Sequence, residues 1–188
     1  EHQDKYSFKD GLERNLAECN LKINFIELNE PTPNQVQTVR EGLKKIGGDF
    51  SFLIKDCDNQ FYFDLGDLDN QEGENFVCYV DLEKVNNSDP SSKSYVVVDE
   101  FGYVSNIAEK KIISNKFCCG AYHFESSEAF LNIKPRTEPD WYISDIIFIL
   151  SLEGASFKAV QCSGYEDWGT LEQWNKYKKQ FKTLFCDL

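Results

Sequence analysis

Apolar positions along the chain recur at two spacings, which distinguish predicted helices from predicted strands. Val36, Val39 and Leu43 follow a helical spacing and predict a helix over 35–46. A short apolar run at 52–54 is typical of a strand that is covered on both faces. Further helices are predicted over 1–20, 142–152 and 171–184, with a short one capped by Ser126 or Ser127. Further strands are predicted over 22–28, 76–82, 95–99, 117–124 and 157–162. One more strand follows a turn at 99–103 and ends at 107–110. A polar hinge is predicted over 165–170.

Strand, helix and strand follow one another over 22–55, an order that predicts a right-handed crossover with a parallel pair. This places Asp56 and Asp58 at the carboxyl end of a parallel strand, where open α/β sheets bind their ligands. If the strand geometry continues, the two side chains point the same way. The alternative is that Asp-Cys-Asp-Asn at 56–59 is a turn that closes the strand, because Asp and Asn favour turns.

Composition bounds the classes of protein that the chain can represent. Of its 188 residues, 41% are hydrophobic and 14% aromatic, which suits one domain with a substantial core. The formal net charge of −12 disfavours nonspecific binding to nucleic acid or to an anionic membrane. No run approaches the roughly 18 apolar residues of a membrane span, and no cleavable signal pattern is visible. We therefore expect a single soluble, cytoplasmic domain over 1–188.

The cysteines and histidines favour structural roles. Seven cysteines without a Cys-x-x-Cys pair are typical of a reducing compartment and not of a disulfide framework. Cys118 and Cys119 are adjacent in a predicted strand, so they are expected to point to opposite faces. His2 and His123 lack the spacing of a zinc-ligand pair. We interpret His123 as a strand residue and not as a catalytic base.

Three clusters of charged residues lie where predicted strands meet loops: 56–59, 109–110 and 166–170. If the fold brings them to one sheet edge, they form a set of hard oxygen ligands beside a lysine. Such a set suits Mg²⁺, which binds one or two carboxylates together with substrate phosphates. The alternatives are a solvated charge run at 109–111 and an ordinary helix start, with Thr170 as the cap and Gln173 at the third helical position.

These clusters and their neighbours resemble, in order along the chain, motifs of the nucleotide-sugar pyrophosphorylases, or sugar-phosphate nucleotidyltransferases. The similar segments are 52–59, 107–110 with Ser114 and Asn115, the Gly-x-Tyr-x-Phe strand at 120–124, the Ile-Ser-Asp helix core at 143–146, and the Asp-x-Gly-Thr segment at 167–170. The loop at 31–38 is similar to the segment that approaches the nucleotide base, although Asn34 stands where the family commonly has glycine. The family's opening Gly-x-Gly-x-Arg loop, which cradles the triphosphate, has no counterpart in the sequence.

The resemblance implies an α/β fold of the GT-A/Rossmann-like, three-layer kind with a mixed, mainly parallel central sheet. It also implies that the domain is N-terminally truncated and lacks the family's first strand and triphosphate-binding loop.

The resemblance further implies roles for particular residues. Lys110 and Asp58 are the implied catalytic residues, with Lys110 at the sugar phosphate. Asp58 and Asp167 are the implied ligands of Mg²⁺, and Asp56 assists as a third metal residue through bound water. The implied substrate-binding residues are Glu109, Lys110, Gly120 and Gln37.

The implied reaction is Mg²⁺-dependent transfer of a nucleotidyl group from a nucleoside triphosphate to a sugar 1-phosphate or similar phosphorylated substrate, with release of pyrophosphate. It brings two anions together, so positioning and charge neutralisation are the expected means of catalysis. Without a triphosphate loop, weak or no activity is expected of this chain. The alternatives are a noncatalytic nucleotide- or sugar-binding module, and a GT-A glycosyltransferase with Asp56 and Asp58 as its Asp-x-Asp. The expected partners are the triphosphate and the sugar phosphate, not nucleic acid or a membrane. The sequence is also compatible with a homo-oligomer.

Overall fold

The computed structural model describes residues 8–16, 23–63, 74–85 and 90–185, in two units that span 1–31 and 32–188. The first unit contains helix α2 (Phe8–Leu16), which confirms the predicted first helix over those residues. The ends of that predicted helix lie outside the described residues. The strand predicted over 22–28 is wrong at 23–28, which form neither helix nor strand.

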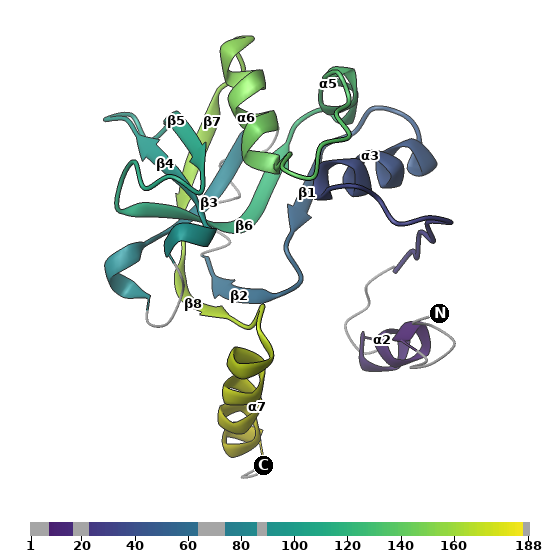
Figure 1. The fold of residues 1–188 in the computed structure, drawn as a ribbon, viewed down its shortest axis with the longest axis vertical. Coiled ribbons are helices and arrows are strands. Elements are labelled where there is room, and N and C mark those ends of the chain that lie inside the picture. The colour runs from purple at the N-terminus through teal and green to yellow at the C-terminus, as the bar shows by residue number, and fades with distance from the viewer. Residues whose placement is uncertain (1–7, 17–22, 64–73, 86–89, 186–188) are drawn as a thin grey trace. The chain divides into compact units, whose positions relative to one another are not determined.

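The second unit contains a six-stranded sheet, a two-stranded sheet and several helices (Figure 1). Its helices are α3 (Gln35–Ile46), α5 (Ser127–Asn132), α6 (Ile143–Leu152) and α7 (Leu171–Phe185), with short 3₁₀ turns η2 (Leu82–Lys84) and η3 (Pro90–Ser92). Its strands are β1 (Phe52–Lys55), β2 (Asn59–Tyr62), β3 (Asn75–Asp81), β4 (Ser94–Val98), β5 (Val104–Glu109), β6 (Lys116–Phe124), β7 (Phe157–Gln161) and β8 (Ser163–Asp167).

The larger sheet has the strand order β5-β4-β6-β3-β7, and β1 also pairs with β6. Among the described strands of this sheet, β3 and β7 are parallel, whereas every other pairing is antiparallel. The prediction of a mixed α/β sheet is therefore confirmed, but the prediction that it is mainly parallel is wrong. The predicted crossover is also wrong, because 23–28 is not a strand and β1 runs antiparallel to β6, with Phe52 opposite Phe124.

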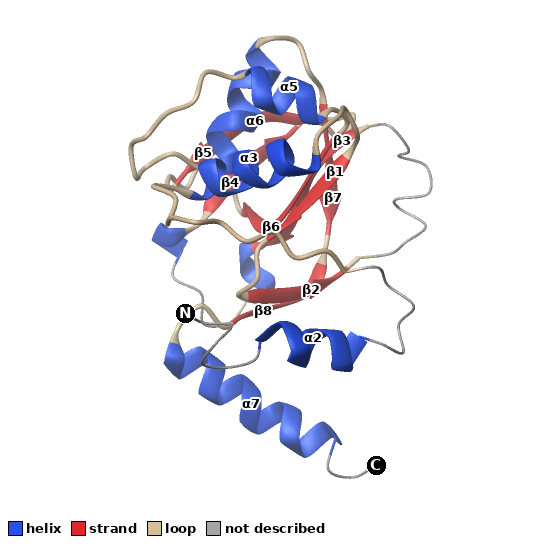
Figure 2. Ribbon diagram, turned by 90° about the vertical axis from the view of Figure 1, so that its right-hand side faces the viewer, coloured by secondary structure: helices blue, strands red, loops and turns tan. Residues whose placement is uncertain are grey.

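The larger sheet buries apolar side chains on both of its faces. Helices α3, α5 and α6 lie together on one side of it (Figure 2), where Val36, Phe130 and Ile146 are fully buried. On the other face, Phe117 of β6 and Tyr165 of the small β2-β8 sheet pack with ring centroids 5.1 Å apart. Each large side chain buried in this way contributes about 1.5–3 kcal/mol. The layers are thus a helical layer, the larger sheet and a smaller layer built from β2, β8 and turns.

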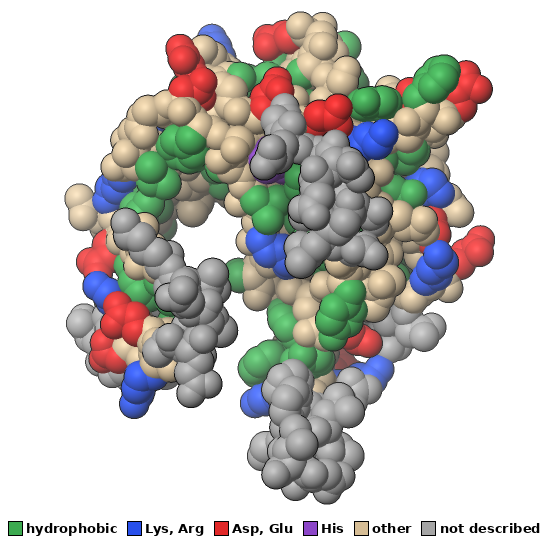
Figure 3. Space-filling view, turned by 180° about the vertical axis from the view of Figure 1, so that it is seen from behind, with side chains coloured by type: hydrophobic (Ala, Val, Ile, Leu, Met, Phe, Trp, Pro, Cys, Tyr) green, Lys and Arg blue, Asp and Glu red, His purple; other side chains and the backbone are tan. Residues whose placement is uncertain are grey.

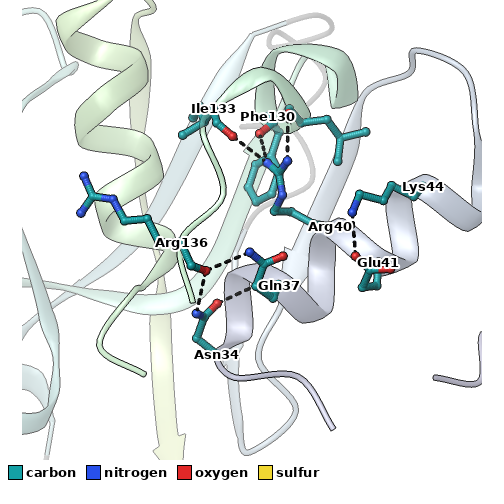
Figure 4. A network of polar contacts seen from close by, with 9 residues as sticks. Asn34, Gln37, Arg40, Glu41, Lys44, Phe130, Ile133 and Arg136 are labelled. Atoms are coloured by element: carbon teal, nitrogen blue, oxygen red, sulfur yellow. Dashed lines mark hydrogen bonds and ion pairs between the residues drawn. The ribbon is translucent and has the colours of Figure 1, made fainter. Parts of the chain in front are cut away.

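Helix α3 holds the chain that leads into α6. Its N-cap, Asn34, accepts a hydrogen bond from the backbone of Gln37 at 2.9 Å. The side-chain amide of Asn34 donates to the Glu138 carbonyl at 2.8 Å, and that of Gln37 donates to the Arg136 carbonyl at 2.9 Å (Figure 4). The Arg40 guanidinium donates to carbonyls over 130–133. These bonds satisfy the carbonyls at the end of α5 and fix the segment before α6.

Strand β6 confirms the predicted positions of its two adjacent cysteines and of His123 in a strand. Cys118 and Cys119 are both buried, Cys118 on the helix-covered face and Cys119 on the opposite face. His123 stacks on Phe76 with ring centroids 4.9 Å apart, and its Nδ1 lies 2.7 Å from the Glu74 carbonyl oxygen. The described cysteines at 57, 78, 118, 119 and 162 are free thiols.

Acidic side chains are scattered over the face seen in Figure 3, in keeping with the net charge of −12. Exposed apolar side chains are distributed over several elements, among them Tyr62, Phe101 and Leu152. Within the described ranges, no helix has the length and apolar character that crossing a membrane requires.

Candidate functional site

A pocket of about 190 Å³ lies where β1, β4 and β5 meet the middle of β6 and the start of α6. Five of the residues predicted for the site line it, although they come from segments far apart in the sequence: Asp56, Asp58, Glu109, Lys110 and Gly120. Asp167 lies beside Asp58, as described below. Gln37 does not line this pocket, whereas Gln35 of the same helix does. The Gln37 amide is instead bound to the carbonyl of Arg136.

Asp56 is packed against the backbone of β6. Its backbone N–H donates to the Gly120 carbonyl at 2.8 Å. A Cβ at position 120 would lie 2.4 Å from Asp56 Oδ2 and 2.9 Å from Asn59 Nδ2, and Gly120 has φ +85°, so this position requires glycine. Burial, and to a lesser degree the charge of Asp58, raise the pKa of Asp56 to about 6. Asp56 therefore releases its proton at a higher pH than an ordinary aspartate does.

Lys55 organises the loop that carries these aspartates. Its ammonium donates to the Asp56 carbonyl at 2.5 Å, to the Asn59 carbonyl at 3.1 Å and to Asn59 Oδ1 at 2.6 Å. Burial lowers the pKa of Lys55. The loop thus curls around one ammonium group, which fixes the direction in which Asp56 and Asp58 leave β1. The sequence did not predict this role, because a lysine at a strand end is typically solvated.

The small sheet brings Asp167 to Asp58. β2 pairs with β8 so that Asn59 lies opposite Asp167, and Trp168 N donates to the Asp58 carbonyl at 2.9 Å. A Cβ at Gly169 would lie 3.1 Å from Asp58 Oδ2 and 3.3 Å from Asp167 Oδ1, so the two carboxylates flank one glycine. The polar hinge predicted over 165–170 is wrong at 165–167, which belong to β8.

Lys93 pairs with Asp167 at this site. Lys93 Nζ lies 2.5 Å from Asp167 Oδ2 and 3.0 Å from the Tyr165 hydroxyl oxygen. Burial alone would lower the pKa of Lys93, but its bonds to Asp167 and Tyr165 raise it above its ordinary value. Lys93 was not predicted, since a lysine in the polar Ser-Ser-Lys-Ser segment carries no signal of a buried partner.

Glu109 and Lys110 have different surroundings. The hydroxyl groups of Ser94 and Ser144 both donate to Glu109 Oε2, the second at 2.6 Å. Lys110 is the one non-glycine residue with positive φ, 52°, in the described part of the chain. Its ammonium binds the Tyr142 hydroxyl and lies 4.4 Å from the centre of that ring, and this hydrogen bond raises its pKa. Lys110 is exposed, as a solvated charge run predicts, but both it and Glu109 have side-chain partners in the pocket wall.

The donor set at Asp58 and Asp167 fits a hard divalent ion that completes its shell with water and phosphate oxygens. Within the described ranges, no three His, Cys, Asp or Glu side chains gather closely enough to hold a metal ion by themselves. Asp56 is turned toward Gly120 and Asn59. The geometry thus favours a two-carboxylate site at Asp58 and Asp167.

Solved structures with similar folds include nucleotide-sugar pyrophosphorylases and related transferases. The nucleoside-diphosphate-sugar pyrophosphorylase from Vibrio cholerae RC9 is 18% identical with a TM-score of 0.72, and the match covers 93% of this chain and 77% of that one. The inositol-1-phosphate CTP transferase from T. maritima is 14% identical with a TM-score of 0.70, over 95% and 73% of the two chains. A putative glucose-1-phosphate thymidylyltransferase from Bacillus anthracis, solved in complex with a sucrose, is 17% identical with a TM-score of 0.69, over 91% and 71%.

The chain has the sugar-phosphate nucleotidyltransferase fold. No protein-family model matches it, and neither does any curated protein sequence. At these identities the likeness is one of fold, and it confirms the resemblance at that level.

Proposed function

We propose that this protein transfers a nucleotidyl group from a nucleoside triphosphate to a sugar 1-phosphate or a similar phosphorylated substrate in a Mg²⁺-dependent reaction. The products are a nucleotide-activated sugar and pyrophosphate. The observation that carries the proposal is the gathering of charged residues from three separate segments of the chain: Asp58, Glu109 and Lys110 line one pocket, and Asp167 lies beside Asp58. The nucleotidyltransferase fold supports it.

Each side chain has a role that its surroundings support. Asp58 and Asp167 would hold Mg²⁺, which would neutralise charge on the reacting phosphates. Lys110, exposed at the pocket rim and held over the Tyr142 ring, would neutralise the sugar phosphate. Glu109 would accept hydrogen bonds from sugar hydroxyls through its second oxygen, because Oε2 already accepts bonds from two serines.

The remaining predicted residues have supporting roles in this proposal. Gly120 lines the pocket and would contact the substrate through its backbone, while Asp56 and Asn59 occupy the space of its missing Cβ. Asp56 would assist through metal-bound water. Gln37 remains the predicted contact for the nucleotide base.

Pyrophosphate release tests the proposal. The purified protein is given each of the four nucleoside triphosphates with a panel of sugar 1-phosphates, with Mg²⁺ or with EDTA. We expect slow release that requires Mg²⁺, one base and a sugar phosphate together, because the sequence has no Gly-x-Gly-x-Arg loop to cradle the triphosphate. Release that is independent of the sugar phosphate would contradict the transfer reaction.

Two alternatives are distinguished by the same assays. Nucleotide binding by calorimetry without pyrophosphate release under any condition would favour a noncatalytic binding module. A GT-A glycosyltransferase is the other candidate, because Asp56 and Asp58 both line the pocket as an Asp-x-Asp pair would. Transfer from a sugar nucleotide to an acceptor, without use of a triphosphate, would identify that activity.

A further inference from the structure

The Lys93 ammonium already occupies the carboxylate that the metal ion would need. Lys93 Nζ is 2.5 Å from Asp167 Oδ2, and the two side chains are 18% and 13% exposed. The other oxygen of Asp167, Oδ1, accepts a hydrogen bond from Gly169 N at 3.0 Å. Both oxygens of Asp167 therefore have protein donors before any ion binds.

Asp58 differs from Asp167 in this respect. It is exposed, and no described residue donates a hydrogen bond to its carboxylate. An ion between the two carboxylates would thus bind the unpaired carboxylate of Asp58 and the carboxylate of Asp167, whose charge Lys93 already neutralises. Two positive charges that share a carboxylate at a partly buried site repel each other.

We propose that Lys93 is a built-in competitor of the divalent ion for Asp167 and weakens the metal affinity of the free site. Lys93 also lines the pocket, so a phosphate group there offers its ammonium a second partner. Metal binding is then strongest when a phosphorylated substrate is present. The inference rests on the proposed function, because it takes Asp58 and Asp167 as the metal ligands.

A second ion pair in the same molecule provides a matched control. Lys116 Nζ lies 3.2 Å from Asp81 Oδ1, with side chains 29% and 17% exposed, and neither residue lines the pocket. Removing the charge of Lys116 therefore breaks a comparable pair without touching Asp167.

The test is a calorimetric titration of Mn²⁺ alone into the wild-type protein and the variants K93M, K93R and K116M. We expect K93M to bind Mn²⁺ about tenfold more tightly or better, because the competing charge is gone. K93R keeps the charge and should bind like the wild type, and so should K116M. If K93M does not fold, K93Q takes its place, since it retains an amide donor for Asp167 without the charge.

Two results would overturn the inference. The first is that K93M binds Mn²⁺ no more tightly than the wild type while D167N abolishes binding. Lys93 would then have a purely structural role, although Asp58 and Asp167 would still be the metal ligands. Absence of Mn²⁺ binding in the wild type and in every Lys93 variant would refute the metal pair as well. Pyrophosphate release judges the transfer reaction separately, so the failures are distinguishable.

Discussion

At the scale of single residues, Gly120 is where the packing behind the pocket is tightest. In G120A, the new Cβ would lie 2.4 Å from Asp56 Oδ2, at a backbone φ of +85°. We expect unfolding in urea to show a loss of about 1–3 kcal/mol of stability. The control is G42A in α3, whose Cβ would meet no atom within 4 Å and which we expect to be neutral or stabilising. Equal stabilities of the two variants would contradict the close approach.

Asp56 should make the stability of the folded protein depend on pH. Its pKa is raised to about 6 by burial, so the folded state binds the proton more tightly than the unfolded state does. The free energy of unfolding of the wild type should therefore fall as the pH rises from about 4 through about 6. The fall should be roughly 3 kcal/mol relative to a protein whose side chain at position 56 cannot titrate.

The measurement is urea unfolding in EDTA from pH 4 to pH 8 for the wild type and D56N. D56N removes the titrating group, so the stability difference between the two proteins should shift in favour of D56N across that range. A difference that does not change with pH would show that Asp56 has an ordinary pKa.

At the scale of elements, Asn34 joins two of them. Its Oδ1 caps α3, while its Nδ2 donates to the Glu138 carbonyl in the segment before α6. We expect N34A to lose both bonds and about 1–2 kcal/mol of stability. N34D keeps the cap acceptor but turns a carboxylate oxygen toward the carbonyls of Arg136 and Glu138, so its loss should be at least as large, and chemical denaturation measures both. A clearly smaller loss in N34D than in N34A would assign the effect to the cap and not to the bond to Glu138.

The strongly periodic elements could be predicted from sequence. The helix over 35–46 has the predicted bounds, and β3 to β7 and α6 lie within a few residues of their predicted positions. The sequence does not predict β2 and predicts a hinge over most of β8, because Asn-Gln-Phe-Tyr and Ser-Gly-Tyr-Glu-Asp lack a continuous apolar run. The prediction of mainly parallel pairing is wrong because local periodicity does not encode which strands become neighbours.

The start of α7 is compatible both with an ordinary helix cap at Thr170 and with the proposed role of Asp167 as a metal ligand. Thr170 and Gln173 form the reciprocal capping bonds that were predicted as the alternative to a site. Asp167 nevertheless lies beside Asp58, three residues before this cap. The capped helix start fixes the turn that presents Asp167.

At the scale of the whole molecule, the candidate site depends on contacts between distant segments. Motif order predicted Asp58, Glu109, Lys110 and Gly120 at one pocket, and all of them line it. The same reasoning could not find Lys93, because its partner lies 74 residues away along the chain. Long-range ion pairs leave no periodic signal, so the charge balance of the site emerges only from the fold.

The central claim is that Asp58 and Asp167 form one metal site for nucleotidyl transfer. It is tested most directly by Mg²⁺-dependent pyrophosphate release from a nucleoside triphosphate and sugar 1-phosphate by the wild type, D58N and D167N. The exposed Glu128 at the start of α5 supplies the control, E128Q. We predict that each aspartate variant loses about 100-fold or more in turnover while E128Q retains it, because each removes a charge that would hold the metal at the reacting phosphates. Wild-type turnover in both D58N and D167N would contradict the claim.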